Sequence, residues 1–164
     1  MSIRDLSPTY VASCRPEATL ASAAALLDEH DCGILPVVDD AYHVIGVLTD
    51  RDICMSLAAH PATVAQLRVQ DVMSTEVHCI GANDTPAQAM RAMRTHHVHR
   101  LPITASDGVL EGILSLNDLA LSAQEVHEDG RPGPTLTEVA LTLKALCAHH
   151  RRHDIIPREQ LIRI

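Results

Sequence analysis

The sequence contains no phenylalanine and no tryptophan, and Tyr10 and Tyr42 are its only tyrosines. Proteins that hold single-stranded nucleic acid stack successive bases on aromatic side chains. The formal net charge of −8 is a second argument against nucleic acid, because neutralisation of phosphates by lysine and arginine dominates that kind of affinity. A nucleobase bound by this chain is therefore expected to lie between aliphatic side chains and backbone.

Long apolar runs and paired cysteines are missing as well. No stretch reaches the roughly 18 consecutive apolar residues typical of a membrane span, and the N-terminal residues lack the charged and apolar regions of a signal peptide. The five cysteines form no Cys-x-x-Cys pair, which favours buried, reduced thiols over a disulfide framework or a zinc knot. These absences predict a cytoplasmic protein without membrane contact.

Signatures of catalysis are absent too. The sequence has no Gly-x-Ser-x-Gly elbow, no Walker loop and no Gly-rich dinucleotide fingerprint. His149 and His153 stand four residues apart, a spacing that on a helix clamps a metal ion, but no nearby glutamate completes such a motif. We expect neither an enzyme nor a functional metal site, and we expect the cluster of His96, His97 and His99 to be solvated or to pair with the dipole at a helix C-terminus.

What the chain does contain is an internal repeat. Residues 5–57 align without a gap on residues 71–123, so that residue 5 matches residue 71, and 13 of the 53 aligned positions are identical. Two copies of one supersecondary unit usually bury their apolar faces together. We therefore expect two related clefts between the copies, and we expect binding to take place there.

Each copy is predicted to fold as a β-α-β-β-α unit, which gives an α/β (α+β) protein. Apolar residues recur at three- and four-residue spacing in the helical stretches, and β-branched runs flank the turns. In the first copy the sequence predicts an extended segment at 9–14, a helix at 20–30, strands at 34–38 and 44–48, and a helix after Thr49. In the second copy the corresponding ranges are 75–80, 86–97, 100–104 and 109–114, and a helix follows Ser115.

The rest of the chain divides into a connecting segment at 58–70, a Gly/Pro-rich linker at 124–134 and a C-terminal region at 135–164. Thr135 and Glu138 have the spacing of a capping box. An apolar face on a helix of about four turns then comprises Leu136, Val139, Ala140, Leu143, Leu146 and Cys147. This helix is expected to dock on the protein's own core or, as the alternative, to form a subunit contact.

The repeated strand–helix junctions carry the pattern Gly-x-x-(Thr/Ser)-x-x-Asp, at Gly46 to Asp52 and at Gly112 to Asp118. A helix N-terminus attracts phosphate, a hydroxyl there adds a donor, and an aspartate one turn later can accept both hydroxyls of a ribose. Ser/Thr-x-x-Asp is also the spacing of a helix capping box, in which the aspartate serves the backbone alone. Duplication in equal register favours the ligand-binding interpretation.

The order Leu35-Pro36-Val37-Val38-Asp39 followed by 44–53, and Leu101-Pro102-Ile103 followed by 110–119, resembles the cystathionine-β-synthase (CBS) domain. The resemblance covers residues 5–123 and implies a stand-alone tandem CBS pair, a Bateman module. In that family two repeats pack by their sheets with pseudo-two-fold symmetry and bind adenosine derivatives in the clefts. The resemblance implies that Asp52 and Asp118 hold the ribose and that the hydroxyls of Thr49 and Ser115 face the phosphate. The adenine pocket would be lined around Ile34, Leu35 and Pro36 and around Arg100, Leu101 and Pro102.

The copies differ at two positions of this pattern. Arg51, whose planar guanidinium suits phosphate, stands where the second copy has Asn117, and Arg100 stands where the first has Ile34. We therefore expect unequal affinities for an adenine nucleotide (AMP, ADP or ATP) or S-adenosylmethionine, with no cofactor. The family resemblance suggests a homodimer that signals to an unidentified protein target by conformational change. The alternative is a non-catalytic interaction scaffold that acts through the C-terminal helix and has empty clefts.

Overall fold

The computed structural model describes residues 1–6, 11–59, 65–124 and 133–153. The linker predicted at 124–134 and the segments 7–10, 60–64 and 154–164 therefore lie wholly or mostly outside the described residues. By its contacts the chain divides into two compact units, one of residues 1–6, 83–101 and 114–164, the other of residues 7–82 and 102–113.

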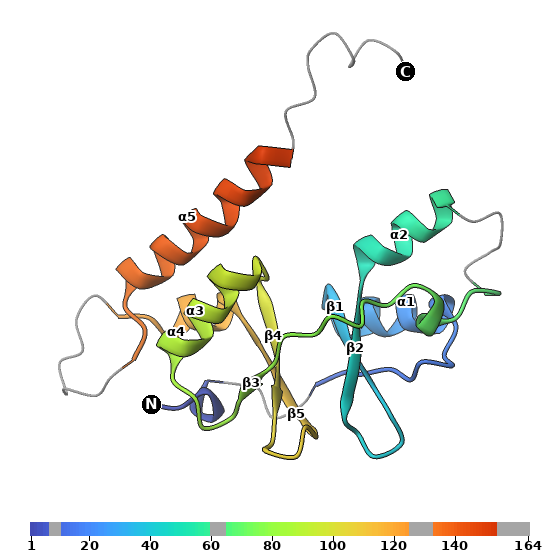
Figure 1. The fold of residues 1–164 in the computed structure, drawn as a ribbon, viewed down its shortest axis with the longest axis horizontal. Coiled ribbons are helices and arrows are strands. Elements are labelled where there is room, and N and C mark those ends of the chain that lie inside the picture. The colour runs from blue at the N-terminus through green and yellow to red at the C-terminus, as the bar shows by residue number, and fades with distance from the viewer. Residues whose placement is uncertain (7–10, 60–64, 125–132, 154–164) are drawn as a thin grey trace, which may run out of the picture. The chain divides into compact units, whose positions relative to one another are not determined.

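The predicted mixed helix and strand architecture is confirmed (Figure 1). Two strands, β1 and β2, form one antiparallel sheet, and β3, β4 and β5 form a second, in that order. The strands β4 and β5 begin and end 66 positions after β1 and β2. The elements of the first copy are α1 (Leu20–Glu29), β1 (Ile34–Val38), β2 (Val44–Thr49) and α2 (Asp50–Ala59). Those of the second are β3 (Ile80–Gly81), α3 (Pro86–His96), β4 (Arg100–Thr104), β5 (Leu110–Ser115) and α4 (Leu116–Ser122).

The first strand of each copy is shorter than the sequence predicts. In the second copy only Ile80–Gly81 pairs, in parallel with Ile103 and Thr104 of β4. In the first copy residues 9 and 10 lie outside the described residues, and within 11–14 Cys14 forms a parallel bridge with Val37.

Threonine caps fix the starts of α1 and α3. The hydroxyl oxygen of Thr19 accepts a hydrogen bond from the Ser22 amide at 3.1 Å. Thr85 forms a full capping box with Gln88, and Pro86 occupies the first turn, where a missing N–H costs nothing. The helix α3 ends at His96, and its C-cap residue His97 adopts the left-handed conformation with φ of 55°.

The core of the first copy forms where α1 covers the β1–β2 sheet. Leu20, Ala23 and Leu27, the residues predicted at helical spacing, are buried there with Leu35 and Leu48 of the sheet. In the second copy Ala89, Met90 and Met93 of α3 are buried as predicted. The apolar periodicity therefore identified the inward face of both helices.

Two 3-10 turns, η1 (Ile3–Asp5) and η2 (Val69–Asp71), precede the two copies. The amide of Ile3 donates to the carbonyl of Asp84 at 2.9 Å, within one compact unit. The amide of Val69 donates to the carbonyl of Ala18 at 2.9 Å, within the other. The turn η1 precedes the first copy but is bonded to the loop before α3 of the second copy. The turn η2 precedes the second copy but is bonded to the loop before α1 of the first copy.

The tips of the two hairpins are joined by backbone hydrogen bonds. His43 and Val109 form an antiparallel bridge, flanked by Val44 N–H to Gly108 O at 3.3 Å and Leu110 N–H to Tyr42 O at 2.9 Å. His43 and Val109 are equivalent positions of the repeat. Val44 is equivalent to Leu110 and Tyr42 to Gly108, so each flanking hydrogen bond is the counterpart of the other. The joint between the hairpins is therefore locally two-fold symmetric.

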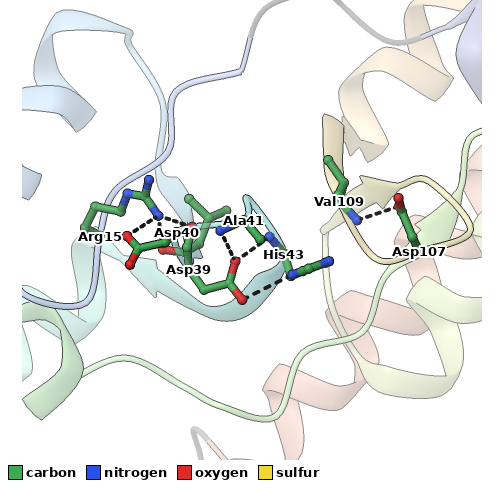
Figure 2. A network of polar contacts seen from close by, with 8 residues as sticks. Arg15, Asp39, Asp40, Ala41, His43, Asp107 and Val109 are labelled. Carbon is green, nitrogen blue, oxygen red and sulfur yellow. Dashed lines mark hydrogen bonds and ion pairs between the residues drawn. The ribbon is translucent and has the colours of Figure 1, made fainter.

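Side chains on the first hairpin hold its turn in shape (Figure 2). The Asp39 carboxylate accepts hydrogen bonds from the amides of Ala41 and His43, each at 2.9 Å, and its second oxygen lies 3.2 Å from Nδ1 of His43. Arg15 donates to the Asp39 carbonyl, lies 3.5 Å from the Asp40 carboxylate, and covers the Tyr42 ring. The turn that forms the joint is thus fixed independently of the partner hairpin.

This network predicts an acid-dependent turn. The His43 amide, followed by the other contacts around Asp39, lowers the pKa of that carboxyl below its ordinary value of 3.8. Because the pKa of Asp39 is lower in the folded than in the unfolded chain, its carboxylate stabilises the turn fully at pH values above the unfolded-state pKa. This stabilisation is lost as the pH falls through the folded-state pKa. We expect the amide NMR signals of Ala41 and His43 to shift as the pH is lowered below about 4. In Asp39→Asn, which lacks this carboxyl but keeps Asp40, the same signals should shift less; equal shifts in both proteins would contradict the assignment.

The C-terminal helix α5 (Leu136–His153) begins with the predicted capping box of Thr135 and Glu138. It packs against α3 and α4 within its own unit, as the first of the two expectations has it, and a subunit contact through its exposed side stays a prediction. The predicted apolar face is only partly right. The buried side chains are Val139, Thr142 and Leu146, whereas the other four residues of that face, Leu136, Ala140, Leu143 and Cys147, are exposed.

Thr142 explains the rotation of the helix α5 relative to the prediction. Its hydroxyl is fully buried, donates to the Glu138 carbonyl at 2.8 Å and accepts from an Arg94 guanidinium N–H at 2.6 Å. A buried hydroxyl is tolerated when it is hydrogen-bonded. Because Arg94 lies on α3, far away in the sequence, the apolar pattern of α5 alone did not reveal which face is buried.

All five cysteines are free, but the prediction that they are buried is wrong for most of them. Cys14 is buried, and burial raises the pKa of its thiol to about 11. Cys54, Cys79 and Cys147 are exposed. A free cysteine is small and weakly polar, so its position in a helix or loop does not reveal which way it faces. Among the helices in the described part of the chain, none is both long and apolar enough to cross a membrane.

Candidate functional site

The first junction lies where β2 ends and α2 begins. Thr49 is the last residue of the strand, and its backbone amide and hydroxyl donate to Oδ2 of Asp52 at 2.9 and 2.6 Å. The amide of Asp52 in turn donates to the Thr49 hydroxyl at 3.2 Å. Both residues are half-buried. The pair therefore forms a closed ring of hydrogen bonds across the first turn of α2.

The second junction repeats this arrangement between β5 and α4. Ser115 donates from its amide and hydroxyl to Oδ2 of Asp118 at 2.7 and 2.6 Å, and accepts from the Asp118 amide at 3.2 Å. These two residues are half-buried as well. Identical hydrogen bonds at equivalent positions show that both copies of the motif are built by one local rule.

That rule is helix capping. The same ring of three hydrogen bonds joins Thr85 to Gln88 at α3 and Thr135 to Glu138 at α5, where the sequence pattern predicted no site. Within the described residues, however, Oδ1 of Asp52 and Oδ1 of Asp118 accept no hydrogen bond. Each carboxylate therefore caps its helix with one oxygen and keeps the other for a further donor.

The amides at the helix starts are largely used. In α2 the Arg51 amide donates to the Asp50 carboxylate at 2.7 Å, and in α4 the Leu116 amide donates to the His99 carbonyl at 2.9 Å. In the described part of the chain, one of the first three amides of each helix has no acceptor, that of Asp50 and that of Asn117. Backbone N–H groups thus provide less for a phosphate than the sequence predicted.

The aliphatic residues of the first copy lie beside the first junction. In the β1–β2 register Ile34 is opposite Thr49, Leu35 opposite Leu48 and Pro36 opposite Val47. Leu35 and Pro36 are buried, and Ile34 is half-buried. The side chain of Leu35 belongs to the core, so only its main chain can meet a ligand.

In the second copy Leu101 and Pro102 are likewise buried, and Arg100 and Asn117 are exposed. Arg51 of the first copy is exposed too. The side chains of Arg51 and Arg100 make no hydrogen bond or ion pair with any described residue. Both guanidinium groups are therefore available to an anion.

The glycine of the first motif has a structural role that the sequence did not reveal. A Cβ atom at Gly46 would lie 2.7 Å from Sδ of Met73 and 3.1 Å from the carbonyl oxygen of Ser74. Ser74 and Val47 exchange two backbone hydrogen bonds of 2.9 Å each, so this segment runs along the outer edge of β2. The missing side chain at Gly46 thus makes room for the backbone of Ser74, a residue of this chain, beside β2.

Metal ligands are not assembled in the described part of the chain, where no three His, Cys, Asp or Glu side chains are placed to hold an ion. The side chains of His149 and His153, the pair with i, i+4 spacing, lie outside the described residues.

Comparison with known proteins gives consistent matches. A family model described as "CBS domain" matches residues 3–59 and 69–124. The CBS domain-containing protein YhcV of Bacillus subtilis (strain 168) is 36% identical over 129 residues, which cover 79% of this chain and 90% of that protein. A crystal structure of Hypoxic Response Protein I with two coordinated zinc ions is 28% identical, has a TM-score of 0.67, and is matched over 74% of this chain and 98% of its own. The CBS domain pair of protein MJ0100, in complex with 5-methylthioadenosine and S-adenosyl-L-methionine, has a TM-score of 0.66 at 18% identity and covers 74% and 94%.

Proposed function

Because this chain belongs to the CBS domain family, of which it carries two copies in tandem, we propose that it is a regulatory module that binds an adenosyl compound. The candidate ligands are AMP, ADP, ATP and S-adenosylmethionine. Support comes from a pair of CBS domains of the same fold that has been crystallised with 5-methylthioadenosine and S-adenosyl-L-methionine. The two copies are assigned to residues 5–57 and 71–123.

The observation that carries the proposal is the unused carboxylate oxygen at each junction. Oδ1 of Asp52 and Oδ1 of Asp118 accept no bond within the described residues, beside helix starts that keep one amide without an acceptor. A ribose diol supplies the two hydroxyl donors that such an oxygen can accept. Arg51 near the first junction and Arg100 in the second copy supply positive charge for a phosphate.

Signalling would follow from linkage. A ligand that binds one arrangement of the repeats more tightly than another shifts the population toward it. In a homodimer, which we also propose, the change would reach the partner subunit and a protein target. In this proposal the module acts by binding.

Titration calorimetry on Asp52→Ala and Asp118→Ala tests the site. Loss of a charge-assisted hydrogen bond is worth about 1.5–3 kcal/mol, so each substitution is expected to weaken the ligand at its own junction by about tenfold or more. Gln88→Ala is the matched control, because Gln88 makes the same capping hydrogen bonds on α3. If neither aspartate substitution weakens any of the four ligands, the assignment of the site is wrong.

A thermal-shift series against the same four compounds separates the module from an interaction scaffold that works through α5. A ligand present at 100 times its Kd stabilises the folded state by about 2.7 kcal/mol, which raises the melting temperature measurably. A scaffold with empty clefts would show the same melting temperature with each compound.

A further inference from the structure

The helix α5 carries an apolar stripe on a side that its own unit leaves exposed. The stripe consists of Leu136, Ala140, Leu143 and Cys147, which follow one another at intervals of four, three and four residues. Leu136 and Leu143 are each 46% exposed. Alternating intervals of four and three are those of the a and d positions in a coiled coil, so the stripe has the form of a seam for a second helix. The family model ends at residue 124, so α5 lies outside the CBS repeats.

The order of large and small residues along the stripe favours an antiparallel partner with the same sequence. When a second α5 is laid antiparallel with its Leu143 opposite Ala140, its Cys147 comes to lie opposite Leu136. Every layer of the seam then joins one leucine to one smaller residue. The distance between two packed helices depends on the side chains at the contact, so this order keeps that distance even. A parallel pair would instead place leucine on leucine in one layer and alanine on alanine in the next.

The charges along this part of the sequence favour the same arrangement. Residues 125–138 include four carboxylates and one arginine, whereas residues 144–153 include one lysine, two arginines and no carboxylate. An antiparallel pair brings the basic end of each helix to the acidic end of the other and sets the two helix dipoles in opposite directions. A parallel pair would bring like charges together, which is unfavourable.

We propose that a second molecule of this chain docks on the stripe, so that the two α5 helices pair antiparallel about a two-fold axis. Such a contact is isologous, because each molecule offers the patch that it receives. The helix is already ordered by its capping box and by its packing on α3 and α4. Association therefore does not bear the cost of folding it. This inference specifies the subunit contact of the homodimer in the proposed function, but it requires no ligand.

Disulfide cross-linking of the full chain tests the direction and register of the pair. The background carries Cys54→Ser and Cys79→Ser, which remove two other exposed thiols. In this background Leu136→Cys is expected to give a covalent dimer under mild oxidation, with residue 136 of each molecule linked to Cys147 of the other. Without Leu136→Cys no dimer should form, because the two Cys147 residues of an antiparallel pair are about 16 Å apart along the helix axis. A disulfide between two Cys147 residues would show a parallel pair and would overturn the proposal, as would the absence of the 136–147 link.

Sedimentation equilibrium without ligand measures the contribution of the stripe to assembly. Leu143→Glu places a carboxylate in the seam and is expected to halve the mass of the wild-type assembly. The matched control is Leu141→Glu, the same substitution at a leucine that is 57% exposed and lies on another side of α5. This variant should keep the wild-type mass, and circular dichroism should show equal helix content in both. A monomeric wild-type protein, or equal masses for the two variants, would overturn the proposal.

Failure of this interface can be distinguished from failure of the proposed function, because neither measurement uses a ligand. If none of the four adenosyl compounds binds in calorimetry while the 136–147 disulfide forms, the ligand assignment is wrong and the interface stands. If a ligand binds and no such disulfide forms, the ligand assignment stands and the interface is wrong.

Discussion

Truncation of Leu35 to alanine is expected to lower the free energy of unfolding by about 2–5 kcal/mol. Leu35 is fully buried on β1, in the core cluster that contains Leu27 and Leu48. The backbone beside it cannot move to fill the cavity, because β1 is paired to β2 on one side and bridged by Cys14 on the other. The cost of the cavity is therefore added to the lost burial of the side chain.

Urea unfolding followed by far-UV circular dichroism measures this loss, since the chain has no tryptophan for fluorescence. Leu101→Ala, at the equivalent position of the second copy and equally buried, should cost a similar amount. The control is Leu121→Ala, whose side chain is 88% exposed and whose removal should change stability by less than about 0.5 kcal/mol. A Leu35→Ala protein as stable as the Leu121→Ala protein would contradict the packing described for β1.

Gly46→Ala is the second substitution with a large expected effect, a loss of about 1–3 kcal/mol from overpacking. The new methyl group would lie 2.7 Å from the Met73 sulfur and 3.1 Å from the Ser74 carbonyl oxygen. The Met73 side chain can rotate away. The Ser74 oxygen is held by the Val47 amide at 2.9 Å, so relieving the contact requires a shift of β2 or of the segment along it.

The two contacts can be separated by measuring Gly46→Ala in the wild-type and in the Met73→Ala background. Removing the sulfur should reduce the cost of the methyl group but not abolish it, because the contact with the Ser74 oxygen remains. A cost that vanishes in the Met73→Ala background would mean that the backbone approach is not limiting. Because β2 leads directly into Thr49, the same substitution should also weaken binding at the first junction.

Much of the fold could be predicted because local signals agreed. The bounds of β1 and β4 match the predicted ranges, and Thr19 and Thr85 begin the helices where the apolar spacing starts. The orientation of α5 could not be predicted, since it depends on the pairing of Thr142 with Arg94, 48 positions away. The approach of Ser74 to Gly46 was equally invisible, because it joins segments whose pairing leaves no periodic pattern.

For the site, the sequence predicted which residues would lie close together but not which hydrogen bonds they would form with one another. The aspartate of each motif is one turn from its hydroxyl by helix geometry, so the proximity of Thr49 to Asp52 followed from spacing alone. The same spacing describes a capping box and a ribose site. Which oxygen of Asp52 is used, and which is left, depends on the rotamer in the folded chain.

The symmetric joint between the hairpin tips has an evolutionary consequence. At His43 and Val109 each copy offers the other the same backbone donor and acceptor that it receives, which is the defining property of an isologous contact. A half-length ancestor with this hairpin would therefore have been able to pair with a second molecule of itself. Fusion of two such genes makes the association intramolecular, independent of protein concentration. It also frees the halves to diverge, as the Asp39–His43 pair on one tip and Val109 on the other already show.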